Sequence, residues 1–229
     1  MAEHDPSWLD EAGRRSVSEA VAVAEAQSAG EIVTILAERS DHYGDVALVW
    51  SALVAFAALA VIALWPDFYL SKLSLISGGW NAEWTASHAF AIAAAVATIK
   101  FAAMWLLQLW PPLKFLLVPG PVKTARVHER AVTAFRIGAE RRTRGRTGIL
   151  IYLSMREHRA EIVADEAIAA RVDPHVWGDA MAVMLAELKQ GHVAEGMCAA
   201  VERVGAILAA HLPRDAQDIN ELPDRLIEL

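Results

Sequence analysis

Residues Val46–Trp65 read VALVWSALVAFAALAVIALW, a run of 20 residues without a charge. As a helix this run would extend about 30 Å, the thickness of the hydrocarbon core of a bilayer. A second apolar run, Ala89–Trp110, has 22 residues and a single charge, Lys100. The pattern predicts a transmembrane hairpin with spans at about 46–65 and 89–110. Two buried core helices are the alternative interpretation.

The hairpin divides the rest of the chain into two segments on the same side of the membrane. Segment 1–43 contains a helical pattern within Asp10–Gln27 and then EIVTILAE at Glu31–Glu38, a β-branched run typical of a buried strand. A single strand needs partners, so it must join a sheet built by segment 122–229. The sequence therefore predicts one split domain, 1–43 with 122–229, interrupted by a membrane segment at 44–121.

The second segment supplies the rest of the sheet. TGILIYLS at Thr147–Ser154 is apolar throughout, which predicts a central strand, and Asp173 followed by Pro174 is typical of a helix start. The remaining predicted elements are helices at Arg126–Arg142 and Val193–Leu212, a strand at Ala160–Ala164, and a short interfacial stretch at Leu113–Val118. The alternative for this last stretch is a continuation of the second span, kinked at the prolines. The predicted fold class is α/β, with a small central sheet flanked by helices.

Charge is unevenly distributed along the chain, whose net charge is −7. Between Lys114 and Arg146 we count nine Lys or Arg against two acids, so this stretch carries +7 and the rest carries −14. An acidic body with one basic stretch argues against nucleic-acid binding. The single cysteine, Cys198, excludes an intrachain disulfide and is predicted to be a buried, unreactive thiol.

Basic residues also predict the orientation of the hairpin. Lys114, Lys123, Arg126 and Arg130 follow the second span, whereas the connecting loop Pro66–His88 contains only one lysine. By the positive-inside rule both termini are cytoplasmic and the loop faces outward. The first 43 residues are acidic and amphipathic, unlike a signal peptide.

The chain resembles the TPM-domain family. The residues that carry the resemblance are AGEIVTILAE at Ala29–Glu38, RTGILIYLSMREHRAEIVADEAIAARV at Arg146–Val172, Trp177, LKQGHVAEGMCAAVERVGAILAAHLP at Leu188–Pro213, and NELPDRL at Asn220–Leu226. The resemblance implies a small sheet flanked by helices. It points to the bacterial membrane-bound branch, with two transmembrane helices inserted after the first strand, and hence to the bacterial inner membrane.

The resemblance implies two kinds of function. Some relatives are described as acid phosphatases or as binders of divalent metal, and others act through membrane partners. Many relatives have Asp-Asn-Gly before the central strand and a Gly-x-Gly loop after the next strand. Here these positions read Arg146-Thr147-Gly148 and Val163–Glu166. Because a hard cation requires oxygen ligands, this departure counts against metal binding and phosphatase activity.

Three acids, Glu161, Asp165 and Glu166, lie within six residues where the second strand of this segment ends. They are candidate cation ligands or a catalytic acid/base pair. The structural alternative, which we favour, makes Asp165 or Glu166 a helix cap and pairs Glu161 with Arg156 or Arg159.

Five cations are further candidates. Arg141, Arg142, Arg144 and Arg146 would bind a phosphate or an anionic lipid headgroup, or else form a solvated helix end. Lys100 lies within the second span, where an unpaired charge costs a few kcal/mol. Contact with a partner subunit, a buried polar contact within the hairpin, or a side chain that reaches back to the interface would explain it.

The sequence predicts neither a metal site nor a cofactor. The eight histidines are scattered, and no HExxH, Cys-x-x-Cys, phosphate-binding loop or dinucleotide motif occurs. We therefore predict a non-enzymatic module that is anchored in the inner membrane and binds or modulates a membrane protein or a second copy. The alternative is a phosphomonoesterase, with or without a divalent cation, that uses Glu161 and Asp165 with the arginines as a phosphate clamp.

Overall fold

The computed structural model describes residues 8–67, 71, 85–138, 147–214 and 221–229. These residues belong to two compact units, which we describe separately. One unit, Met1–Asp41 with Gly120–Leu229, contains the sheet, and the other, His42–Pro119, contains the two apolar helices.

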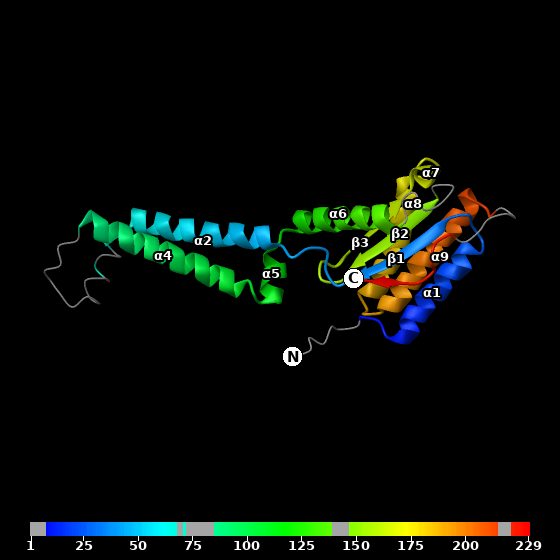
Figure 1. The fold of residues 1–229 in the computed structure, drawn as a ribbon, viewed down its shortest axis with the longest axis horizontal. Helices are drawn as coiled ribbons and strands as arrows, with labels where there is room; N and C mark the ends of the chain where they lie inside the picture. The colour runs from blue at the N-terminus through cyan, green and yellow to red at the C-terminus, as the bar shows by residue number, and fades with distance from the viewer. Residues whose placement is uncertain (1–7, 68–70, 72–84, 139–146, 215–220) are drawn as a thin grey trace. The chain divides into compact units, whose positions relative to one another are not determined.

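A mixed sheet of four strands forms the centre of the first unit (Figure 1). The strands are β1 (Glu31–Ala37), β2 (Gly148–Ser154), β3 (Arg159–Ala164) and β4 (Ile227–Glu228), in the order β3-β2-β1-β4. β1 runs parallel to β2 and β4, whereas β2 and β3 are antiparallel. Every residue of β1 and β2 is buried, because helices cover both faces, and this explains their continuous apolar sequences. β2 is internal, as predicted.

Helices cover the two faces of the sheet unequally. α1 (Glu11–Glu25), α8 (Pro174–Leu188) and α9 (Val193–His211) share one apolar core with one face. α6 (Gly120–Gly138) packs on the other face through buried residues that include Val127 and Phe135. The predicted fold class is confirmed.

Local sequence signals explain where most of these helices begin. Asp10 caps α1 and accepts the N–H of Gly13 at 2.7 Å, and Asp173 caps α8 as predicted. α6 begins at Gly120 rather than at the expected Arg126, since Pro121 fits the first turn of a helix. The expected end of this helix at Arg142 lies outside the described residues.

The second unit contains α2 (Gly44–Leu64), α4 (Ala86–Leu107) and α5 (Pro111–Leu117). By length and composition, α2 and α4 are each apolar enough to cross a membrane, and most of their residues are not buried inside the protein. The amide nitrogen of Gln108 donates to the backbone oxygen of Ala47 at 3.1 Å, so the end of α4 lies beside the start of α2. The predicted interfacial stretch is a separate short helix, α5, which begins at two prolines.

Candidate functional site

Four polar side chains meet at the carboxyl ends of β1 and β2. The backbone N–H of Ser40 donates to the Glu157 carboxylate at 3.0 Å, and the Ser40 hydroxyl lies 3.0 Å from Ser154 and 3.1 Å from the hydroxyl of Tyr152. Ser154 also donates to Glu157. Tyr152, Ser154 and Glu157 are buried, and burial raises the pKa of the Tyr152 hydroxyl. This network orders the chain just after β1.

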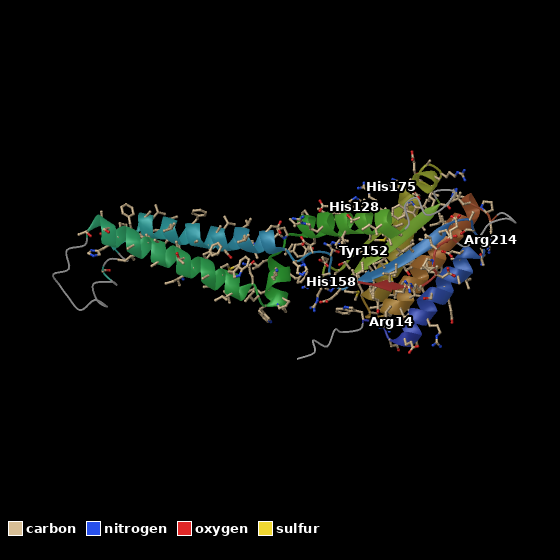
Figure 2. All side chains as sticks on the ribbon, viewed as in Figure 1. Arg14, His128, Tyr152, His158, His175 and Arg214 are labelled. Atoms are coloured by element: carbon tan, nitrogen blue, oxygen red, sulfur yellow. The ribbon has the colours of Figure 1, made fainter. Side chains whose placement is uncertain are left out.

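A cavity of about 380 Å³ lies beside the network. Its apolar lining includes Trp8, Leu185, Leu188 and Val193, and its polar lining includes Ser154, His158 and Lys189. The volume is typical of a small-molecule site. His158 has a backbone φ of 53°, a left-handed conformation that is uncommon for residues other than glycine (Tyr152 and His158 are labelled in Figure 2). The cavity can accept an apolar ligand or an apolar side chain of a partner.

Glu161, the first candidate acid, lies on β3. Its carboxylate is 3.5 Å from Nδ1 of His128 on α6. The expected ion pair with Arg156 or Arg159 does not form, so this prediction was wrong. Arg156 instead pairs with Glu38 at 3.1 Å, and Arg159 donates to the backbone oxygen of its neighbour. Both arginines follow β2, and the turn directs Arg156 toward the end of β1.

Asp165, the second candidate acid, occupies the N-cap of the short helix α7 (Glu166–Ala169), as the structural interpretation predicted. Its side chain makes no capping hydrogen bond, and its Oδ2 is buried with no hydrogen-bond partner within the described part of the chain. Glu161 lies four residues earlier on extended chain, about 13 Å away along the strand. The two carboxylates are therefore not adjacent, as an acid/base pair acting on one bond would need to be.

Of the five candidate cations, the structure describes Lys100 and not the four arginines. Arg141, Arg142, Arg144 and Arg146 lie outside the described residues, whereas Lys100 is exposed on α4. Over the described ranges, no group of three or more His, Cys, Asp or Glu side chains lies close enough to hold a metal ion.

Besides Glu157, two further buried acids were missed at the level of sequence. Glu25, at the end of α1, accepts the backbone N–H of Ile32 at 2.7 Å. Burial raises the pKa of Glu25 to about 8, and the nearby charge of Glu31 adds to this effect. Glu31 in turn accepts the backbone N–H groups of Glu221 and Leu222 at 3.2 and 3.1 Å, which holds the C-terminal segment beside the sheet. For Glu31, the only sequence signal of this role was its place at the first position of a buried strand.

Cys198 is half-buried on α9 and lines a second cavity, of about 390 Å³, between α1 and α9. Burial and the charges of Glu202 and Glu195 raise the pKa of its thiol. The thiol is therefore less buried than predicted, and its raised pKa keeps it protonated at neutral pH.

Together these features define a class of protein: a small mixed sheet with helices on both faces, whose chain is interrupted after its first strand by two long apolar helices. The family model of the TPM domain matches residues 122–207. This match confirms, for residues 122–207, the resemblance to the TPM-domain family found in the sequence. The match begins after the apolar helices, and the structure adds α1 and β1 to the same folded unit.

A solved structure shows the same fold. The NMR structure of the BA42 protein from the psychrophilic bacterium Bizionia argentinensis aligns with a TM-score of 0.57 and 16% sequence identity, and the alignment covers 100% of each chain. At this level of identity the similarity concerns the fold alone. Comparison with curated proteins gives no match.

Proposed function

We propose that this protein is a membrane-anchored TPM-domain module that binds or modulates a membrane protein and has no enzymatic activity of its own. The observation that carries the proposal is the insertion of α2 and α4 between β1 and β2, two strands that are hydrogen-bonded neighbours. Large apolar side chains on both helices are exposed, for example Phe56 at 68% and Phe90 at 75%. Such surfaces are stable in hydrocarbon rather than in water.

The proposal includes a location and an orientation. The helices span the bacterial inner membrane, and both termini and the TPM domain are cytoplasmic. The density of Lys and Arg after α4, compared with the single lysine in Pro66–His88, supports this orientation.

The position of the anchor within the domain supports a binding role. The chain leaves the domain after β1 and returns at α6, so the anchor holds the domain at two points of its fold. A domain held at the membrane surface meets membrane-embedded partners at a high effective concentration. The partner is another membrane protein or a second copy of this chain.

Reporter fusions and cross-linking test this proposal on the full chain. A reporter after Leu229 should be active on the cytoplasmic side, and one inserted within Pro66–His88 on the outer side. Cross-linking in native membranes should then capture a membrane protein or a second copy in stoichiometric amount. The opposite reporter pattern, or an anchored chain that remains without a partner, contradicts the proposal.

One observation favours the alternative function, a phosphomonoesterase. Asp165 is buried with an unpartnered Oδ2 among the described residues, and leaving such a group unsatisfied costs about 1–3 kcal/mol. A ligand or a divalent cation bound to this oxygen would remove that cost. The distance to Glu161 along β3 argues against a shared catalytic site, so we rank this function second.

A further inference from the structure

Lys100 is a charged residue on a helix that is otherwise without charge. It is exposed on α4, and α4 has no other Asp, Glu, Lys or Arg. Among the residues that the structure describes, Lys100 makes no hydrogen bond or ion pair. If α4 spans the bilayer, as the proposed function requires, this ammonium group needs either water or a partner of opposite charge.

The depth of Lys100 and the direction of its side chain argue against an ammonium group that reaches the membrane–water interface. Lys100 lies seven residues before Leu107, the nearer end of α4, which is about 10 Å along the helix. In a helix every Cα–Cβ bond tilts toward the N-terminus, so the side chain leaves the backbone in the direction away from Leu107. A lysine stem of about 6 Å is also shorter than the distance of about 10 Å to that end of the helix.

Within the described part of the hairpin, no residue supplies a counter-charge at this depth. α2 contains one acid, Asp45, in its first turn. The hydrogen bond between Gln108 and Ala47 shows that this turn lies beside the end of α4, beyond Leu107. Asp45 is therefore more than one helical turn away from Lys100 along the hairpin axis.

A second copy of this chain would not supply the charge either. Its two apolar helices contain the same residues, so at this depth it adds a second lysine and no acid. Like charges in hydrocarbon repel, and the pairing of two copies through this face is disfavoured. Charge complementarity thus selects a different protein.

We infer that the Lys100 face of α4 binds a transmembrane helix of another protein that carries an Asp or Glu near the middle of its span. The small and exposed Ala103, one turn from Lys100, allows the backbone of such a helix to approach closely. This inference rests on the proposed function and specifies the chemistry of the partner.

Peptide binding in vesicles tests the inference. The full chain, labelled at its C-terminus, is reconstituted in phosphatidylcholine vesicles with a Leu/Ala transmembrane peptide that carries one central Glu, and energy transfer reports binding. Matched peptides carry Gln or Leu at the same position. We expect the Glu peptide to bind about 3- to 20-fold more tightly than the Leu peptide, the range of polar contacts between helices in membranes.

Two variants identify the residue responsible. Lys100→Met should abolish the preference for Glu, whereas Lys114→Met, which removes the same charge from α5, should leave it intact. Equal binding of the Glu and Leu peptides, equal binding of the Glu and Gln peptides, or a preference that survives Lys100→Met overturns the inference. Extraction of the chain from the vesicles by alkaline carbonate overturns the membrane anchor as well, so the two failures are distinguishable.

Discussion

The backbone N–H of Ser40 donates to the buried carboxylate of Glu157 at 3.0 Å. Ser40 is the second-last residue of the first unit before the apolar helices, and Glu157 lies in the turn between β2 and β3. The contact therefore ties the outgoing chain to the sheet. The Arg126 guanidinium, on the returning helix α6, lies 3.2 Å from Asp41 and adds a more exposed tie at the same point of the chain.

Removal of the Glu157 carboxylate should destabilise the fold. Glu157→Ala leaves the Ser40 N–H and the Ser154 hydroxyl without their buried acceptor, and we expect the free energy of unfolding to fall by about 2–4 kcal/mol. Thermal unfolding of the detergent-solubilised chain measures this. Glu202→Ala, an exposed glutamate on α9, is the matched control and should change little. Equal stability of the two variants would show that the network contributes nothing.

Glu25 should make the fold less stable as the pH rises. Its folded-state pKa of about 8 lies above the value of 4.5 for the unfolded chain, because burial disfavours the charged form. The folded state therefore binds the proton more tightly, so this contribution is present below pH 4.5 and is lost as the pH rises toward 8. Its upper limit is about 5 kcal/mol.

Glu25→Gln should flatten this dependence, because the amide oxygen still accepts the N–H of Ile32 and does not ionise. Melting temperatures between pH 5 and pH 8.5 check the prediction, with exposed Glu19→Gln on the same helix as the control. A variant that loses stability with pH as steeply as the parent would refute the role of Glu25.

Replacement of two helical glycines by alanine should change the stability in opposite directions. At Gly205 on α9, a Cβ atom would lie 2.6 Å from the Cβ of Ala24 and 3.3 Å from its Cα, so α1 and α9 would have to separate. Gly205→Ala should destabilise the domain by about 1–3 kcal/mol. Gly178 on α8 has no neighbour within 4 Å, and Gly178→Ala should stabilise by about 0.5–1 kcal/mol. Chemical denaturation of both variants tests the close approach of α1 and α9.

Phosphate-ester turnover distinguishes the two proposed functions. The purified chain should not hydrolyse a generic phosphomonoester such as p-nitrophenyl phosphate, with or without Mg²⁺, and Asp165→Asn should behave like the parent. Hydrolysis that requires the Asp165 carboxylate would instead favour the phosphomonoesterase. Activity that is unchanged in Asp165→Asn would indicate a contaminant or another site.

Local sequence patterns predicted most of the elements correctly. The runs EIVTILAE and TGILIYLS became β1 and β2, and the cap at Asp173 lies where the sequence indicated. The two-residue strand β4 was missed because a strand this short has no periodicity of its own. It forms where Ile227 pairs with Ile35, a partner distant in the chain.

The candidate site was less predictable because its contacts also join residues that are distant in the chain. Asp165 lies at the predicted cap position, yet whether its carboxylate has a partner depends on neighbours from other elements. Glu161 pairs with His128 rather than with the arginines nearer in sequence, because α6 packs against β3. Glu25, Glu31 and Glu157 look like ordinary surface acids until distant segments bury them.

The sequence by itself determined the apolar helices, the buried strands and the need for a sheet shared by two segments, since hydrophobic length and periodicity are properties of neighbouring residues. Only the tertiary structure decided which acids are buried, which backbone groups they accept, and how the C-terminal segment joins the sheet. Those outcomes depend on contacts between residues far apart in the chain, and such contacts are determined by the packing of whole elements.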